Sequence, residues 1–367
     1  MSQLSCHFQP LPFSYDILIR PGLLQDGAFF KTRLFPLASR FVLIADEKTA
    51  SLYGVALQKI LGDKTLLLSF PEGEGNKTRA TKERLEDQLL EQGYGSDTGI
   101  IALGGGIVTD LVGFVAATYC RGVPLGMIPT SLMAMVDAGL GGKTGVNTPY
   151  GKNMIGCLYQ PKLVLIDPCL VSSLPLKDLR NGIVEIIKHS LIADALLFAY
   201  LDLHRDKLLA LDSEILSYAI SKSCQIKIAL VEQGPKRTLL NFGHTVGHAL
   251  ETLTHYTLSH GEAVAIGILV ESHMALQMGL LSQRNFEKIQ NIFVRYGLPL
   301  TLPRSFSSAE CKKTMQLDKK SLLGNPRFVL LKDIGVTKSC EGIFCSCVEE
   351  SVLETALTWM NDGMCCN

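Results

Sequence analysis

Four of the eight histidines in the chain fall within residues 237–264, RTLLNFGHTVGHALETLTHYTLSHGEAV. His244 and His248 are four residues apart in a run with helical periodicity, so both imidazoles project from one face, as in helical metal sites. His260 follows in SHGE, just before an apolar run. Each histidine taken alone could equally be a core or capping residue. The cluster as a whole favours a divalent metal site, which needs one more ligand from elsewhere in the chain.

A carboxylate that could complete such a site occurs in the sequence NGIVEIIKH. Glu185 lies three residues before Lys188 and four before His189, so all three can share one face of a helix. The same spacing accounts equally well for an ordinary ion pair on a helix surface. Glu185 is therefore the candidate for the missing ligand, with the ion pair as its alternative.

Three consecutive glycines, at positions 104 to 106, lie where a strand-like run passes into a helix-like run. Bare backbone amides and the positive end of a helix can bind a pyrophosphate there. Because GGGIVTDLVG lacks the third glycine of G-x-G-x-x-G, a tight structural turn is the alternative. Asp110 either complements the helix dipole or faces the ligand. Thr130 and Ser131 follow the next strand, where their hydroxyls can cap a helix or contact a ribose or phosphate.

A second dense stretch covers residues 135–156, MVDAGLGGKTGVNTPYGKNMIG. Its six glycines and weak helical periodicity predict a loop of 22 residues, and loops of that length in a compact domain are usually functional. Lys143 and Lys152 suit a phosphate or a carboxylate, although each could be a solvated surface lysine.

Alternating strands and helices must position these residues in the first half of the chain. Short apolar runs predict buried strands, with SYDILI at a sheet edge and helical patterns between the others. This alternation predicts a mostly parallel sheet that binds ligands at the carboxyl ends of its strands. From residue 175 onward apolar residues recur at helical spacing, so we expect a mostly α-helical second half with the boundary near residue 172. The expected strands are FVLIAD (41–46), TLLLSF (65–70), GIIALG (99–104), the run before Thr130 and KLVLIDP (162–168).

The closing region has a simpler expected structure. The sequence LDKKSLLGNPRFVLL predicts a hairpin packed against the helices. Residues 349–360 predict a final helix, and the last four residues, MCCN, a loose end.

Composition excludes several classes of function. Lysine plus arginine (35) balances aspartate plus glutamate (35), so no global positive field exists to bind nucleic acid or an anionic membrane. No signal-peptide pattern or membrane-spanning run is apparent. The eleven cysteines lack C-x-x-C spacing and indicate reduced thiols in the cytoplasm. Cys345, Cys347, Cys365 and Cys366 have no helpful ligand spacing, so we interpret them as incidental.

Together these stretches resemble the 3-dehydroquinate synthases over nearly the whole chain. The resemblance implies an NAD-binding α/β domain in residues 1–172, a helical metal- and substrate-binding domain in residues 173–367, and an active site between them. It also implies Zn²⁺ or Co²⁺ and a homodimer. The motifs that carry it occur in this order: PEGEGNKT, GGGIVTD, IPTSLMAMVDAGLGGKTGVN, GKNMIG, NGIVEIIKH, LLNFGHTVGHALE, HGEAV and LDKK.

The resemblance also implies roles for individual residues. Glu185, His244 and His260 match the metal ligands, whereas His248 matches a non-ligand histidine near the substrate, so helical spacing alone selects the wrong pair. The substrate-side positions are matched by Asp137, Lys143, Lys152, Asn153, Lys188, Arg237, Asn241 and one of Lys319 and Lys320, with Arg121 reaching across from a partner subunit. The nucleotide-side positions are matched by Asp46, Glu74, Lys77, Gly105, Gly106, Asp110, Thr130 and Ser131, with Lys143 and Lys152 adjoining them.

The implied reaction converts a phosphorylated keto acid, 3-deoxy-D-arabino-heptulosonate 7-phosphate, to 3-dehydroquinate and phosphate in the shikimate pathway. It is a carbon–oxygen lyase reaction in which NAD is reduced transiently, phosphate is eliminated, the hydride returns and an aldol reaction closes the ring. A sister cyclase acting on another sugar phosphate, a metal-dependent polyol dehydrogenase and a non-catalytic NAD- or metal-binding regulator are the alternatives. The retained ligands and lysines favour the synthase over all three.

Two departures from the family pattern are visible. Only IALVEQGPK separates Lys227 from Arg237, where the family commonly has a longer acidic stretch, so we expect at most a minor role for Lys227. Asp178 stands where a longer glutamate is common. Neither departure touches the predicted metal ligands.

Overall fold

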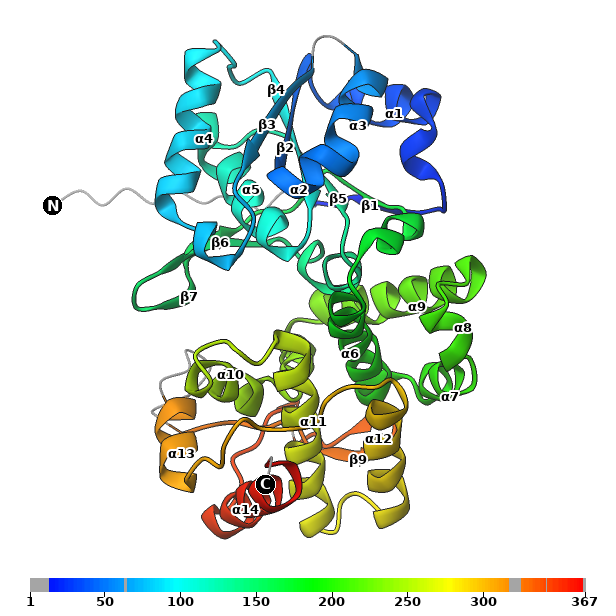
Figure 1. Cartoon of the computed structure of the whole chain (residues 1–367), viewed down its shortest axis with the longest axis vertical. Helices are drawn as coiled ribbons and strands as arrows, with labels where there is room; N and C mark the ends of the chain where they lie inside the picture. The colour runs from blue at the N-terminus through cyan, green and yellow to red at the C-terminus, as the bar shows by residue number, and fades with distance from the viewer. Residues whose placement is uncertain (1–12, 63–64, 317–324, 341, 366–367) are drawn as a thin grey trace, which may run out of the picture.

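The computed structural model describes residues 13–62, 65–316, 325–340 and 342–365. Lys319 and Lys320, one of which is expected at the substrate site, lie outside these ranges. Figure 1 shows a lobe built around a sheet and a lobe of helices, with α6 (Leu176–Ala193) and α9 (Ser213–Glu232) near the junction. The expected α/β and helical halves are both present.

Six parallel strands form the sheet of the first half, and the strand order is β1-β8-β5-β4-β2-β3. The apolar runs of its inner strands are buried because helices cover the sheet, as is typical of parallel sheets. The SYDILI segment forms the expected edge strand and pairs only with β8 in the described sheet. The strands are β1 (Asp16–Ile19), β2 (Arg40–Asp46), β3 (Thr65–Phe70), β4 (Thr98–Gly104), β5 (Leu125–Pro129) and β8 (Leu163–Ile166).

Helices connect these strands, and their ends follow the local sequence. Thr78 caps α4 by accepting a hydrogen bond from the backbone N–H of Thr81, and Gly105 begins α5 directly after β4. The α-helices are α1 (Gly27–Arg33), α2 (Glu47–Thr49), α3 (Val55–Leu61), α4 (Arg79–Glu91) and α5 (Gly106–Thr118). Single turns complete the half: η1 (Leu23–Gln25), η2 (Phe35–Leu37), η3 (Ala50–Gly54), η4 (Glu74–Asn76), η5 (Tyr119–Arg121), η6 (Ala134–Ala138) and η7 (Pro168–Ser173).

The predicted 22-residue loop is wrong in part. After η6, the chain forms an antiparallel hairpin of β6 (Lys143–Thr148) and β7 (Gly151–Leu158), which projects from the sheet lobe in Figure 1. Gly145 and Gly156 face each other across the hairpin, and a Cβ at Gly156 would lie 1.9 Å from the carbonyl oxygen of Thr144. The glycines therefore permit a close approach of two strands, which composition alone does not distinguish from a loop.

The second half is helical, as expected. Its first helix, α6, is amphipathic but almost wholly buried from Leu179 to Ile192. We propose residue 172 as the boundary, between the last strand of the sheet and this helix. The helices are α6, α7 (Ala195–Leu203), α8 (Arg205–Leu209), α9, η8 (Gly234–Asn241), α10 (His244–Leu253), α11 (His260–Gln277), α12 (Gln283–Arg295), α13 (Ser308–Gln316) and α14 (Glu350–Met364).

The C-terminal region differs in part from expectation. Residues 317–324 of the predicted hairpin lie outside the described ranges, and beyond them β9 (Leu331–Asp333) pairs antiparallel with β10 (Val336–Thr337). The chain end is not loose up to Cys365: Met364 is buried, and its carbonyl oxygen accepts a hydrogen bond from the backbone N–H of Leu302 at 2.6 Å. None of the helices in the described part of the chain combines the length and apolar character needed to cross a membrane.

Candidate active site

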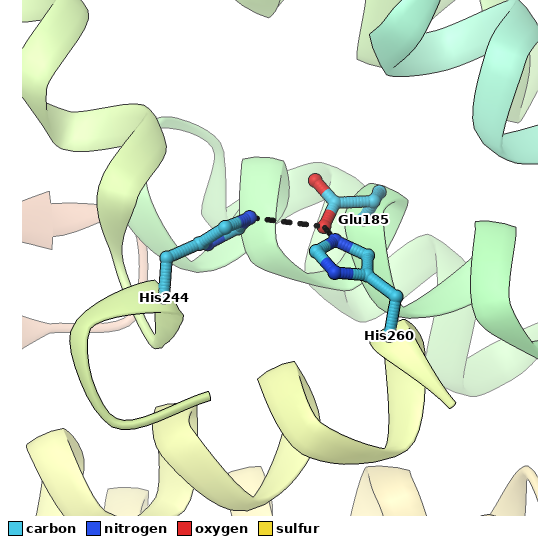
Figure 2. A group of neighbouring side chains, drawn as sticks. All are labelled: Glu185, His244 and His260. Atoms are coloured by element: carbon cyan, nitrogen blue, oxygen red, sulfur yellow. Dashed lines mark ion pairs between the residues drawn. The ribbon is translucent and has the colours of Figure 1, made fainter. Parts of the chain in front are cut away.

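Three helices bring together the ligands that were expected to bind a metal. Glu185 comes from the middle of α6, while His244 and His260 are the first residues of α10 and α11. Glu185 Oε1 lies 3.7 Å from His244 Nε2 and 3.6 Å from His260 Nε2, as Figure 2 shows. Ligands of a tetrahedral zinc ion, with bonds of about 2.0–2.2 Å, are separated by about 3.3–3.6 Å. The described residues also provide no hydrogen-bond donor to the buried Glu185 Oε1, so the three atoms fit one divalent ion.

Both histidines are oriented by partners on their other ring nitrogen. His244 Nδ1 lies 3.0 Å from the carbonyl oxygen of Phe242, and His260 Nδ1 lies 3.3 Å from Glu251 Oε2. When Nδ1–H donates to these oxygens, the lone pair of Nε2 points toward Glu185. The local sequence supports this placement, because Ser259 and Glu262 form a capping box that fixes the start of α11 at His260.

Buried ion pairs determine the protonation of Glu185 and His260. Burial disfavours ionisation of Glu185, but Lys188 and His260 outweigh burial and lower the pKa of Glu185 to about 2. Burial also opposes the charged form of His260, but Glu185 and Glu251 raise its pKa to about 10. In the absence of metal, His260 therefore carries a proton at neutral pH. A metal bound at Nε2 would replace that proton.

Two other groupings of ligand atoms overlap this centre. One consists of His248, Glu251 and His260, and the other of Asp137, Glu185 and His189. In the second, Asp137 already pairs with Lys227, so a lysine neutralises the carboxylate that distinguishes this grouping from the first one described. The imidazole of His189 has its Nδ1 2.7 Å from Ser223 Oγ, and burial lowers its pKa to about 3. We therefore assign the metal to the Glu185, His244 and His260 group.

A cluster of cations lies beside the metal centre. Lys227 Nζ donates to Asp137 Oδ1 at 2.5 Å, and Arg237 reaches the carbonyl oxygen of Gly141 at 3.5 Å. Burial opposes ionisation of Asp137, but the charges of Lys227 and Lys188 hold its pKa well below the usual range. The cluster carries more positive than negative charge, which suits an anionic substrate.

Lys143 belongs to the same cluster. Much of its side chain is accessible to solvent, yet the surrounding protein disfavours the charged amine, and the nearby cations Lys227 and Arg237 add to that effect. The pKa of Lys143 is therefore lowered, although Asp137 opposes the shift. An anion bound there would restore the charged form.

The expected nucleotide-side residues gather at the carboxyl ends of adjacent strands. Asp46 ends β2, Gly105 follows β4, and Thr130 and Ser131 follow β5, and these strands are in parallel register. A Cβ at Gly105 would lie 3.3 Å from Ser131 Oγ, so the two segments are in contact. This is the edge at which parallel α/β sheets bind nucleotides. Asp46 and Ser131 also cap the short helices that follow them.

Lys77 links the nucleotide side to the β6–β7 hairpin. Its buried ammonium donates to Asp110 Oδ2 at 2.6 Å and to Asn153 Oδ1 at 2.5 Å. Glu74 Oε1 accepts a hydrogen bond from Asn147 Nδ2 at 2.7 Å in the same region. Burial raises the pKa of Asp110, although the charge of Lys77 opposes that shift.

The remaining expected residues lie on other elements of the structure. Arg121 lies on η5 at the far end of α5 from Gly105, and a helix of this length separates its ends by roughly 20 Å. Asn241 ends η8, three residues before His244. Lys152 pairs with Glu251 at 3.5 Å rather than with a residue of the nucleotide side.

Sequence reasoning missed Glu251 and underestimated Lys227. Glu251 follows His244 by seven residues and His248 by three, so all three lie on one face of α10. That spacing was available in the sequence HTVGHALE, but a carboxylate on an amphipathic helix is usually exposed, whereas Glu251 is buried. The position of Lys227 beside Asp137 depends on the packing of α9 against η6.

Comparison with known proteins gives the family. The family model described as 3-dehydroquinate synthase N-terminal matches residues 67–181, and the C-terminal model of the same family matches residues 182–321. The chain belongs to the 3-dehydroquinate synthase family. Curated 3-dehydroquinate synthases include one from Desulforamulus reducens, 41% identical over 88% of this chain and 92% of the relative, and one from Thermodesulfovibrio yellowstonii, 40% identical over 89% and 92%.

Solved structures share the architecture of this 3-dehydroquinate synthase family member. A 2-epi-5-epi-valiolone synthase from Streptomyces hygroscopicus subsp. jinggangensis, solved with NAD⁺ and Zn²⁺, has a TM-score of 0.87 at 28% identity and covers 97% of this chain and 99% of its own. A 2-deoxy-scyllo-inosose synthase, solved with carbaglucose-6-phosphate, NAD⁺ and Co²⁺, has a TM-score of 0.81 at 22% identity and covers 95% and 97%. The second likeness shows the fold alone.

Proposed function

We propose that the chain is a 3-dehydroquinate synthase, which converts 3-deoxy-D-arabino-heptulosonate 7-phosphate to 3-dehydroquinate and phosphate. Curated relatives with this name are about 40% identical over most of the chain. The observation that carries the proposal is the convergence of Glu185, His244 and His260 beside a cluster of cations. A redox-assisted elimination of phosphate from a keto acid phosphate needs both features.

The residues fit both cofactors. Glu185, His244 and His260 would hold Zn²⁺ or Co²⁺, while Asp46, Gly105, Thr130 and Ser131 would face NAD. When bound, NAD⁺ would accept and return a hydride at the substrate, and the metal would lower the pKa of the alcohol to be oxidised. Support for these cofactors comes from the valiolone synthase structure, which contains NAD⁺ and Zn²⁺.

The chain's own residues bind and orient the substrate. Lys143, Lys227 and Arg237 would hold its anionic groups, and Asp137 fixes the position of Lys227 by accepting its hydrogen bond. His248 stands next to the metal ligands, with its ring centre 5.4 Å from that of His244. Holding the reacting groups in one geometry can lower the barrier by about 7–11 kcal/mol.

Phosphate release tests the proposal directly. Purified protein is incubated with 3-deoxy-D-arabino-heptulosonate 7-phosphate, NAD⁺ and Zn²⁺, and inorganic phosphate and NADH are measured in parallel. We expect phosphate release that depends on both cofactors, without net NADH, because the hydride returns to the substrate. Accumulation of NADH with a polyol would contradict the proposal and favour a dehydrogenase. No turnover under any condition would favour a non-catalytic binding protein.

A sister cyclase is the second candidate, because solved structures with high TM-scores belong to other cyclases. The charge of the site favours an acid, because Lys143 feels the charges of Lys188, Lys227 and Arg237, and the carboxylates paired with this cluster are those of Asp137 and Glu185. We expect a seven-carbon sugar phosphate without a carboxylate to release phosphate at least tenfold more slowly at the same concentration. A faster rate with the sugar phosphate that lacks the carboxylate would instead identify the sister activity.

We further propose that the enzyme is a homodimer of the cytoplasm. Strand β7 exposes large apolar side chains, with Met154 55%, Ile155 36% and Leu158 68% exposed, as surfaces covered by another copy often do. Arg121, distant from the nucleotide edge of its own sheet, could then serve the partner's site. Free thiols in the described ranges include Cys120, Cys157, Cys169, Cys224 and Cys311, which supports a reducing compartment.

A further inference from the structure

Glu251 has two separate ion-pair partners at the active site. Its Oε2 lies 3.3 Å from His260 Nδ1, and its Oε1 lies 3.5 Å from Lys152 Nζ. Its side chain is only 8% exposed, so solvent screens these charges weakly. A single buried carboxylate thus contacts both a metal ligand and a lysine expected to bind substrate.

The two partners come from different halves of the molecule. His260 begins α11 in the helical half, whereas Lys152 lies on β7, in the hairpin between β5 and β8 of the sheet half. Lys152 Nζ also lies 3.9 Å from the ring centre of Tyr256, close enough for a cation–π contact. The backbone N–H of Tyr256 donates to the carbonyl oxygen of Glu251 at 2.8 Å. Both contacts of Lys152 therefore depend on the turn formed by residues 251–256.

We propose that Glu251 is a positioning residue that couples the metal centre to the β6–β7 hairpin. Through Oε2 it orients the imidazole of His260 so that Nε2 faces the metal. Through Oε1, with Tyr256, it holds Lys152 and thereby the exposed strand β7 against the helical half. The inference rests on the proposed metal site and adds a residue that contacts neither the metal nor the reacting atoms.

The first measurement is Zn²⁺ affinity by competition with a chelator, using the full chain without substrate. Loss of the partner of a metal-bound histidine typically weakens metal affinity about 10–100-fold. We expect Glu251→Ala to fall within that range, and Glu251→Gln to lose about tenfold because its amide oxygen can still accept from Nδ1–H. Asp97→Asn, which removes an exposed ion pair with Arg40, is the matched control and should leave affinity unchanged.

The second measurement is backbone hydrogen exchange in residues 151–158 of the Zn²⁺-loaded protein. Both Glu251 variants should exchange faster there than the wild type, while the strands of the large sheet and the Asp97→Asn control should not change. The Glu251→Gln variant preserves side-chain volume, so both measurements can be made on it if the Glu251→Ala variant does not fold.

The outcomes separate the inference from the proposed function. Zn²⁺ affinity within twofold of wild type in the Glu251 variants would overturn the inference, and so would weakened affinity with unchanged exchange in the hairpin. Failure of the wild-type protein itself to bind one equivalent of Zn²⁺ would instead count against the proposed function.

Discussion

At the scale of single residues, the metal centre shows how burial and pairing set protonation. Glu185 is fully buried, and its ionised form depends on Lys188 and His260. His260 in turn depends on two carboxylates, Glu185 and Glu251. Because both carboxylates have a pKa of about 2, the proton that metal binding must displace is the one on His260.

The first prediction concerns pH. His260 has a pKa raised from 6.5 to about 10, so Zn²⁺ binding at neutral pH releases one proton from it. We expect the apparent Zn²⁺ affinity to rise about tenfold per unit between about pH 6 and pH 8, measured by chelator competition. In the metal-free protein the same shift stabilises the fold fully below pH 6.5, and this stabilisation is lost as pH rises through about 10. A pH-independent affinity would contradict this assignment.

A second prediction concerns His260 itself. His260→Ala should abolish metal retention and phosphate release, because a ligand and an ion-pair partner of Glu185 are both lost. The α/β half should remain folded, since His260 lies on α11 in the helical half and is not part of the six-stranded sheet. Metal content and circular dichroism test this, with His204→Ala as the matched control at a position whose ring is tilted against that of Tyr200. Full activity with unchanged metal content would refute the role of His260.

At the scale of elements, close packing of α10 and α11 sets the distance between two ligands. Gly267 on α11 faces Gly243, which precedes α10, and a Cβ at Gly267 would lie 1.9 Å from the carbonyl oxygen of Gly243. Gly243 itself has a φ of 76°, which favours glycine. His244 is the next residue, so the position of this ligand depends directly on the contact.

Substitution at this contact gives the third prediction. Gly267→Ala should lower the free energy of unfolding by roughly 1–3 kcal/mol and weaken Zn²⁺ binding, because α10 must move away from α11. Urea denaturation and chelator competition measure the two effects. Gly363→Ala on α14, where a Cβ would meet nothing within 4 Å, is the matched control. It should be neutral or stabilising by up to about 1 kcal/mol, and equal effects of the two variants would rule out the packing explanation.

The elements also show which parts of the structure the sequence could predict. Apolar runs such as FVLIAD and the helical periodicity around Glu185 specify their elements locally, so these predictions are confirmed. The β6–β7 hairpin was not predicted because its strands are glycine-rich, which is also typical of a loop. Their pairing becomes apparent only in the three-dimensional structure. The site assignments came from resemblance, since helical spacing favoured His244 with His248. Glu251 required the fold, because only packing buries it and places His260 and Lys152 on its two oxygens.

At the scale of the whole molecule, the two halves are joined by polar contacts at the site. Lys227 of α9 holds Asp137 of η6, and Glu251 of α10 holds Lys152 of β7. Cys224 of α9 adds a contact to the carbonyl oxygen of Met135. A ligand that binds these groups therefore changes the contacts between the two halves as well as the local geometry of the site.

The fourth prediction concerns the proposed homodimer. Leu158→Lys places a charge in the exposed apolar face of β7 and should shift the protein from dimer to monomer, as measured by light scattering after size exclusion. Turnover should fall with it, because Arg121 of a partner would be lost from each site. Leu203→Lys, at an α7 residue 77% exposed, is the matched control and should leave the mass unchanged. A wild-type protein that is monomeric would refute the proposed assembly.

The edge position of β1 also determines the order in which the protein can be completed during synthesis. β1 pairs with β8 through Asp16 and Leu163, so its partner strand leaves the ribosome 147 residues later. At about 5–20 residues per second, that wait lasts roughly 7–30 seconds. The sheet half can close soon after Ile166 has emerged, before Glu185 and the two histidine ligands have emerged. The nascent chain can therefore form its nucleotide-binding edge well before it can hold a metal.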